Sequence, residues 1–393
     1  MGHLSLKWNT LISPVILDLP PSGIRRFFDL ATEVTGIISL GVGEPDFVTP
    51  RLIRESACYS LEKGYTMYTA NAGLLELREE IAAHLHHNYS VYYEPRDEVL
   101  VTVGTSEALD LALRTIVCPG DEVLIPEPCY VSYASCTIMA GGVPVPIRTT
   151  EEQHFQLTAE QVEALITPRT KAIIINYPNN PTGAIMGKAE LERIAAVVKR
   201  HGLIVLSDEV YDKLTYEGTH TCFAALPDMK DHTILLNGFS KGYAMTGWRL
   251  GYVCGNREVI AAMTKIHQYT MLCAPITAQK AAIDALRRGQ DDITTMVDSY
   301  NQRRRLVVKG LSDIGLPCFE PKGAFYAFPS ITHTGLSSEQ FAERVLREAK
   351  VAVVPGNALG ASGEGHIRIS YASSTENLVE ALDRIGKFMK TVH

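Results

Sequence analysis

Residues 237 to 252 read NGFSKGYAMTGWRLGY. Two long cations, Lys241 and Arg249, lie in a stretch that is otherwise small, aromatic or apolar. A buried lysine is costly unless it is paired or neutral. Either this segment is a surface loop that carries two ordinary charges, or Lys241 is placed there for its amine.

The composition of the 393-residue chain is that of a globular protein, with 46% hydrophobic and 21% charged residues. The net charge of −7 gives no support for binding to nucleic acid or to an anionic membrane surface. The eight cysteines form no C-x-x-C pair, which is typical of free thiols in a reducing compartment, and the histidines show no ligand spacing beside them, so we expect no metal site. No signal peptide and no bilayer-spanning apolar run are evident, so we predict a cytoplasmic protein.

Short apolar runs alternate with amphipathic helical patterns through the middle of the chain, and several runs are too continuously apolar for a sheet with one wet face. This alternation predicts an α/β fold in which a mostly parallel sheet is covered by helices. The expected strands are residues 98–103, 122–125, 171–176, 203–207 and 233–236, with helices such as 188–201 between them.

The pattern of expected helices and strands changes after about residue 290. A long polar helix over 291–313 leads to the segment GAFYAF at 323–328, and a helix over about 337–350 follows. Further strands are expected at 351–354 and 366–370, before a closing amphipathic helix. We therefore predict a large α/β domain over residues 49–290 and a smaller α+β domain built from residues 1–48 and 291–393.

Polar residues that suit a phosphate follow the first expected strand. Gly104, Thr105 and Ser106 open a helix there. Free N–H groups at a helix N-terminus, together with the helix dipole, favour an anion. The same pattern also describes an ordinary helix N-cap.

The later strands are followed by other reactive groups. The third leads into the rigid turn YPNNPTG at 177–183, and the fourth into Asp208 and Tyr211, where Asp208 would also make a good helix N-cap. The fifth leads to Lys241 and Arg249.

These groups are expected to meet, because ligands of an open α/β sheet bind beyond the carboxyl ends of the strands. A phosphate cradle, an acid, a phenol, an amine and a guanidinium are the set that pyridoxal 5′-phosphate (PLP) needs. Its aldehyde bonds to a lysine, its pyridine nitrogen pairs with a carboxylate, and its phosphate takes cations and N–H donors.

With these motifs in view, the chain resembles class I aminotransferases of the aspartate aminotransferase superfamily, the fold-type I PLP enzymes. The resemblance runs from about residue 20 to the C-terminus, and SKGYAMTGWRLGY is among its most specific motifs. It is nearest to bacterial and archaeal alanine-type, aromatic and acetyl-diaminopimelate aminotransferases. It implies a large domain with a mostly parallel seven-stranded sheet, and a smaller α+β domain with an N-terminal active-site segment.

The resemblance also implies the reaction. An L-amino acid, preferably neutral, alanine-type or aromatic, gives its amino group to a 2-oxo acid such as 2-oxoglutarate by ping-pong aldimine/pyridoxamine chemistry. Lys241 matches the Schiff-base lysine, which also serves as general base and acid. Asp208 matches the partner of the pyridine nitrogen, and Tyr211 and Asn180 match donors to the ring oxygen. Tyr130 corresponds to the aromatic residue that stacks on the ring.

Further positions of the resemblance concern the phosphate and the substrate. Tyr68, in GYTMYTANAG, matches a tyrosine that reaches the phosphate of the neighbouring subunit, which implies a homodimer. Arg368, in HIRISYA, matches the arginine that holds the substrate carboxylate, and Gly43, in LGVGEPDF, lines the same pocket beside Asn180. The phosphate cradle corresponds to Gly104, Thr105, Ser106, Ser240 and Arg249.

One position departs from the pattern of the family. Many relatives carry a hydroxyl three residues before the lysine, in contact with the phosphate, and here that position is Gly238. We expect Ser240 to compensate. The segment at residues 17–31 should cover the site, where Ile24, Arg25 and Phe27 either shape the pocket or merely pack the small domain.

Two alternative activities stay open. One is that of an aspartate aminotransferase, and the other is that of a PLP carbon–sulfur β-lyase that uses the same lysine and arginine. A non-enzymatic effector sensor of a transcription regulator would need an added N-terminal DNA-binding domain, for which a match that starts near residue 20 leaves no room. The sequence does not define the amino donor.

Overall fold

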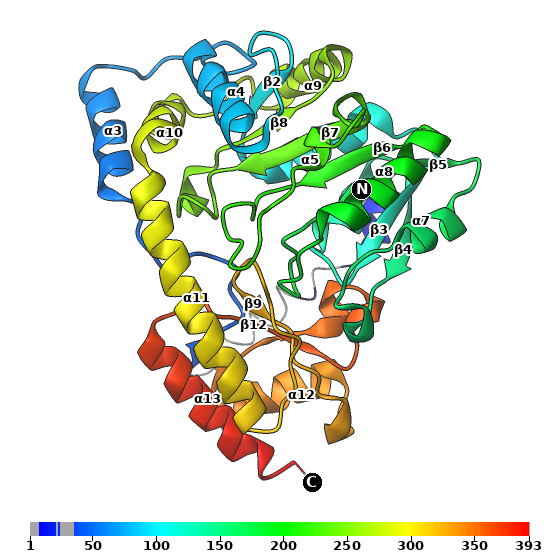
Figure 1. Cartoon of the computed structure of the whole chain (residues 1–393), viewed down its shortest axis with the longest axis vertical. Helices are drawn as coiled ribbons and strands as arrows, with labels where there is room; N and C mark the ends of the chain where they lie inside the picture. The colour runs from blue at the N-terminus through cyan, green and yellow to red at the C-terminus, as the bar shows by residue number, and fades with distance from the viewer. Residues whose placement is uncertain (1–7, 21–22, 24–34, 393) are drawn as a thin grey trace, which may run out of the picture.

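The computed structural model describes residues 8–20, 23 and 35–392. Its centre is a seven-stranded sheet in the order β2-β8-β7-β6-β5-β3-β4, which Figure 1 shows in the upper part of the molecule. Only β8 runs antiparallel to its neighbours, so the predicted mostly parallel sheet is confirmed. The strands are β2 (Val99–Thr102), β3 (Glu122–Glu127), β4 (Val143–Arg148), β5 (Thr170–Ile175), β6 (Ile204–Asp208), β7 (Thr233–Gly238) and β8 (Gly251–Cys254).

Helices cover both faces of this sheet because its strands bury alternate side chains on opposite sides. In β6, for example, Leu206 faces one apolar layer and Val205 the other. The first face carries α5 (Gly104–Ile116), α6 (Ser132–Met139) and α9 (Arg257–Thr270). The second face carries α3 (Arg51–Glu62), α4 (Leu75–Tyr89), α7 (Ala159–Leu165), α8 (Lys188–His201) and α10 (Ile276–Arg288).

The C-terminal part lies below this sheet, and α11 runs along one side of the molecule from the sheet to α13 (Figure 1). Its small sheet has the order β11-β12-β9, and β1 pairs in parallel with β10. The elements are α11 (Gln290–Asp313), β9 (Tyr326–Ala327), α12 (Ser338–Arg344) with a π-helical turn at Val345–Ala349, β10 (Val351–Ala352), β11 (Val354–Pro355), β12 (Ile367–Ser370) and α13 (Thr375–Met389).

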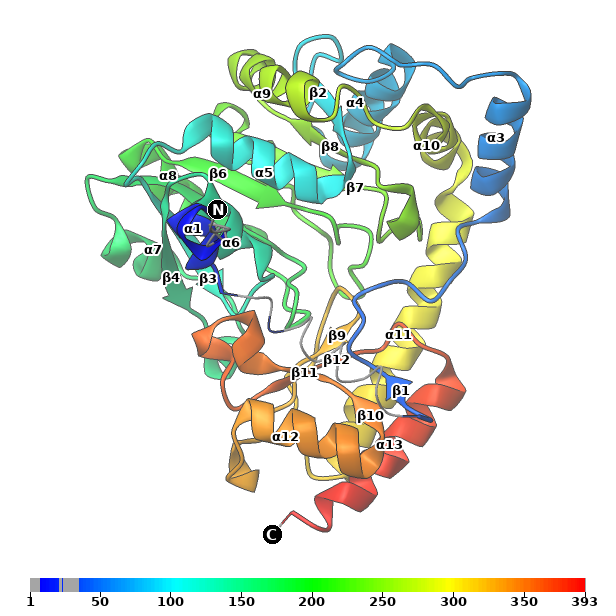
Figure 2. The same cartoon turned by 180° about the vertical axis from the view of Figure 1, so that it is seen from behind.

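The N-terminal part of the described chain contacts both regions. Figure 2 shows β1 (Ile38–Ser39) beside the C-terminal elements, and the chain then crosses to the upper part. A short helix, α1 (Pro14–Leu17), lies near α6. The position of β1 agrees with grouping the residues before 49 with those after 290, whereas α1 lies beside the large sheet, and the domain limits stay a prediction. Within the described ranges, no helix has both the length and the apolar character to cross a membrane.

Candidate active site

A cavity of about 500 Å³ opens at the carboxyl ends of the parallel strands, between the large sheet and the C-terminal part. Its size is in the usual range for sites that hold small molecules and cofactors. Most of the predicted site residues meet there: Gly43, Thr105, Ser106, Tyr130, Asn180, Asp208, Tyr211, Ser240, Lys241, Arg249 and Arg368. Gly104 lies directly beside the lining, whereas Tyr68 is 82% exposed and lies outside it.

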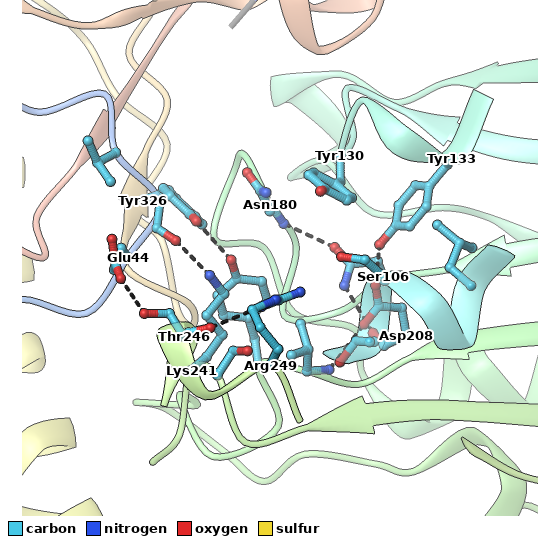
Figure 3. A pocket seen from close by; sticks show the side chains of 18 of the residues that line it. Glu44, Ser106, Tyr130, Tyr133, Asn180, Asp208, Lys241, Thr246, Arg249 and Tyr326 are labelled. Atoms are coloured by element: carbon cyan, nitrogen blue, oxygen red, sulfur yellow. Dashed lines mark hydrogen bonds between the residues drawn. The ribbon is translucent and has the colours of Figure 1, made fainter. Parts of the chain in front are cut away.

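Lys241 follows β7, and its amine lies inside the cavity (Figure 3). Nζ donates a hydrogen bond to the carbonyl of Gly43 at 2.6 Å, and it lies 6.0 Å from the ring centroid of Tyr211. Burial, reinforced by the positive charge of Arg368, lowers the pKa of Lys241 to about 8. An amine with such a pKa can give and take protons near neutral pH.

Asp208 ends β6 and is buried, with its carboxylate turned toward Tyr133 (Figure 3). Oδ2 accepts the hydroxyl of Tyr133 at 2.7 Å, and Oδ1 accepts the N–H of Val210 at 3.2 Å. Burial raises the pKa of Asp208 to about 6. No helix begins at this residue, so the alternative of a simple helix N-cap is wrong.

Arg368, in β12, is 3% exposed, and its guanidinium lies over the ring of Tyr326 at 4.7 Å from the centroid. Nη1 donates to Oδ1 of Asn180 at 2.9 Å, and Nη2 donates to the carbonyl of Gly41 at 2.7 Å. Nε has no hydrogen-bond partner among the described residues. A buried N–H without a partner beside a cavity fits an acceptor that is brought by a ligand, and a carboxylate suits a guanidinium best.

Tyr211 places its hydroxyl 2.8 Å from that of Tyr326. Burial raises the pKa of the Tyr211 phenol well above its usual value, so this phenol stays protonated and can donate a hydrogen bond. Tyr130 lies at the cavity wall, where its ring packs edge-on against Tyr133.

The start of α5 has the features of an anion site. The helix begins at Gly104, whose φ of +76° suits glycine, and the N-cap residue Val103 has no side chain that could bond to the following N–H groups. A Cβ at Gly104 would lie 2.6 Å from Nη2 of Arg249, so the missing side chain lets the guanidinium approach the helix. Ser106 and Ser240 line the same region. Free N–H groups, a guanidinium and two hydroxyls fit a phosphate.

A family model described as "Aminotransferase class I and II" matches residues 35–385. The chain belongs to this family. The aminotransferase is 54% identical to the putative aminotransferase YugH of Bacillus subtilis, over 96% of this chain and 98% of the relative. It is 47% identical to an aspartate aminotransferase of Pyrococcus abyssi, over 95% of this chain and 97% of that relative. The solved structure of an aromatic aminotransferase from Pyrococcus horikoshii is similar with a TM-score of 0.90 and 46% identity, over 94% and 99%.

Members of the class I family use PLP, so the predicted cofactor and the predicted transaminase activity are confirmed. The residues of this aminotransferase fit the group. Asp208 is a buried carboxylate whose two hydrogen-bond donors, Tyr133 and Val210, are both uncharged. That leaves the negative charge of Asp208 for a cationic ring nitrogen. The lowered pKa of Lys241 and the anion site at α5 suit the aldehyde and the phosphate.

The structure explains the departure at Gly238. A Cβ at this position would lie 2.6 Å from Oγ1 of Thr105, which donates to the carbonyl of Asn237 at 3.1 Å. The hydroxyl of Thr105 therefore occupies the space that a side chain at position 238 would need. Ser240 is buried at the cavity wall, and its compensating role stays a prediction.

Sequence reasoning missed nine of the described residues that line the cavity, among them Tyr133, Tyr326, Glu44 and Thr246. Tyr133 and Tyr326 bond to predicted residues, and Glu44 accepts the hydroxyl of Thr246 at the cavity wall (Figure 3). The motifs LGVGEPDF and GAFYAF contain Glu44 and Tyr326, so a signal was present for these two. No sequence signal distinguishes Tyr133 from the other aromatic residues around it.

Proposed function

We propose that this aminotransferase moves the amino group of a neutral, alanine-type or aromatic L-amino acid to a 2-oxo acid such as 2-oxoglutarate. The charges of the cavity support this choice. Among the described lining residues the cations are Lys241, Arg249 and Arg368. If they serve the aldehyde, the phosphate and the α-carboxylate in turn, none of them remains for a distal carboxylate on the donor, and Glu44 adds a negative charge. The distal carboxylate of 2-oxoglutarate meets the same lack of a cation, so pyruvate is tested beside it as acceptor. Ile24, Arg25 and Phe27 lie outside the described residues.

The proposed roles of the side chains follow from their positions. PLP supplies an aldehyde that bonds to amines and a conjugated ring that accepts negative charge. Arg368 holds the substrate carboxylate through a planar fork, which fixes the Cα–H bond for reaction. The amine of Lys241 removes the Cα proton and returns it elsewhere, a task that its pKa of about 8 suits. Asp208 keeps a proton on the ring nitrogen by its negative charge.

The remaining lining residues hold the cofactor in place in this proposal. Tyr211 and Asn180 donate hydrogen bonds to the ring oxygen, and Tyr130 stacks on the ring. The side chain of Asn180 also accepts from Arg368, so it links the cofactor site to the carboxylate site. Gly43 leaves room for the substrate because a Cβ there would collide with the hydroxyl of Tyr326. The phosphate would be held by the residues of the predicted cradle, which are Gly104, Thr105, Ser106, Ser240 and Arg249.

A panel of amino donors tests the substrate class. Phenylalanine, tyrosine, alanine, aspartate and glutamate are compared, with 2-oxoglutarate and pyruvate as acceptors. We expect kcat/KM for the best neutral or aromatic donor to exceed that for aspartate by at least about tenfold, because an unpaired buried carboxylate costs more than 1.4 kcal/mol. The half-reaction with each donor is followed by the cofactor absorbance.

Two outcomes of this panel contradict the proposal. A preference for aspartate would make the chain an aspartate aminotransferase, as its relative from Pyrococcus abyssi is named. Release of pyruvate and ammonia from cystathionine, without any 2-oxo acid present, would instead indicate a carbon–sulfur β-lyase as the main activity.

We also infer a homodimer in which Tyr68 reaches the phosphate of the neighbouring subunit. Tyr68 and Met67 are 82% and 76% exposed, and adjacent large hydrophobic side chains that both face solvent are typical of an interaction surface. Their segment is anchored, since Nδ2 of Asn71 donates to the carbonyl of Leu272 at 2.7 Å. An anchored segment that presents a phenol to solvent supports a role outside its own subunit.

Replacing Tyr68 with phenylalanine tests this inference. The substitution removes one hydrogen bond to a charged phosphate, so we expect the Kd for PLP to rise by about tenfold while the mass in sedimentation equilibrium stays that of a dimer. A monomer at micromolar concentration for the unsubstituted enzyme would refute the homodimer. An unchanged Kd in a dimer would refute the role of Tyr68.

A further inference from the structure

The helix that opens the phosphate site is held from outside by a buried polar pair. His267, in α9, is fully buried, and its Nδ1 lies 2.6 Å from Oε1 of Glu107 in α5. Oε2 of Glu107 accepts the N–H of Val103, the residue before Gly104, at 2.5 Å. The carboxylate therefore ties α9 to the first turn of α5, and the next residues of that turn line the cavity.

This pair is not needed to join the two helices. Around it α5 and α9 already pack through apolar side chains such as Leu109, Ile260 and Met263. Exchanging a buried polar pair for well-packed hydrophobic residues is often neutral or stabilising. In addition, Nε2 of His267 has no hydrogen-bond partner in the part of the chain that the structure describes, so part of the cost of burying this ring is not recovered.

Glu107 stands where a carboxylate can compete with a phosphate. The first N–H groups of an α-helix have no partner within the helix, and acidic side chains near this end bind them readily. While the carboxylate is bound to the N–H of Val103, the following N–H groups of α5 remain for an anion. The bond from His267 holds the second oxygen of Glu107 toward α9.

We infer that His267 is a positioning residue for the phosphate end of PLP. Acting through Glu107, it keeps the N–H groups at the start of α5 open to the phosphate and fixes the backbone at Val103. His267 does not line the cavity, so it touches neither the ring nor the substrate. Without its Nδ1 donor, the carboxylate of Glu107 is free to turn to the helix N-terminus, where its charge opposes the phosphate.

Equilibrium binding to the full-length enzyme, stripped of its cofactor, tests this inference. Two probes are compared: PLP, and pyridoxal, which has the same ring and aldehyde without the phosphate. For His267→Leu we expect the Kd of PLP to rise about tenfold to a hundredfold, the factor that the loss of a hydrogen bond to a charged group produces. The Kd of pyridoxal should change by less than about threefold, because the defect is confined to the phosphate site.

Two amide substitutions of His267, with asparagine and with glutamine, test whether the donor at the position of Nδ1 is what matters. Asparagine places its side-chain N–H₂ near the position of Nδ1, and glutamine places it near that of Nε2. His267→Asn should therefore keep the affinity for PLP within about fivefold, since its donor still reaches Glu107. His267→Gln should raise the Kd of PLP as much as His267→Leu does. Glutamine is the better helix former, so a loss of helix stability predicts the opposite order.

Met263→Ala is the control for general loosening of α9, because Met263 is also fully buried in this helix and has no bond to Glu107. Met263→Ala should leave the ratio of the Kd of PLP to the Kd of pyridoxal unchanged. The inference is overturned if the Kd values of PLP and pyridoxal rise by the same factor in His267→Gln, or if the Kd of PLP does not change in this variant. It is also overturned if Met263→Ala raises the ratio of the Kd of PLP to that of pyridoxal as much as His267→Gln does. Each result would give His267 a purely structural role or none.

Discussion

Replacing Lys241 with alanine is expected to lower the rate of transamination by at least about 10⁴-fold, or more than 5 kcal/mol of transition-state stabilisation. The substitution removes both the amine that bonds to the cofactor and the base that moves the Cα proton. Lys241 is the only lysine among the described residues that line the cavity, so none of those residues can replace it. Single-turnover absorbance changes with one amino donor measure the loss, and the variant should still bind PLP without a covalent bond.

Two further variants test whether the loss in Lys241→Ala comes from the amine itself. One keeps a positive charge at position 241, and the other removes a different lysine. Lys241→Arg keeps a cation but cannot release a proton near neutral pH, so it should be as inactive as the alanine variant. Lys188→Ala removes an exposed lysine of α8 that lies outside the cavity, and should change kcat by less than about threefold. More than about 1% of the activity remaining in Lys241→Ala would overturn the assignment of the base.

The fold was predictable where a buried strand or helix has a clear hydrophobic pattern in the sequence. The five expected strands are present, and α8 spans the predicted residues because Gly202 ends it in a left-handed conformation behind three basic residues. β4 was not predicted, since its sequence VPVPIR contains two prolines, which an edge strand tolerates. β8 was not predicted either, because its four residues GYVC, the first two of which end the lysine motif, are too few to show a period.

The candidate site was predictable where reactive side chains come directly after a strand in the sequence. Lys241, Asp208 and Arg249 were found because each comes after a strand and carries a group that an ordinary turn does not need. The bond from Tyr133 to Asp208 joins residues 75 positions apart, and only the packing of α6 against the sheet brings them together. For the same reason, no pattern in the sequence reveals that His267 meets Glu107 across 160 positions.

Replacing Asp208 with asparagine is expected to preserve the fold and to lower the rate of Cα proton removal by about 10³-fold, or roughly 4 kcal/mol. An amide has nearly the same shape as the carboxylate, and it can still accept one of the hydrogen bonds from Tyr133 and Val210. It lacks the negative charge that keeps the ring nitrogen protonated, so the ring accepts less charge from the substrate. A donor deuterated at Cα should show a larger isotope effect in the variant, because proton removal then limits the rate.

Tyr133→Phe distinguishes the charge of Asp208 from its position. This variant loses the 2.7 Å hydrogen bond to Oδ2 and keeps the carboxylate, so its rate should fall by only about tenfold, as expected for one hydrogen bond to a charged group. Loss of this donor also raises the pKa of Asp208 further above 6, because the bond from Tyr133 stabilises the ionised form. The activity of Tyr133→Phe should therefore decline at a higher pH than that of the unsubstituted enzyme when the solution is acidified. Equal rates for Tyr133→Phe and Asp208→Asn would mean that the placement of Asp208, and not its charge, controls proton removal.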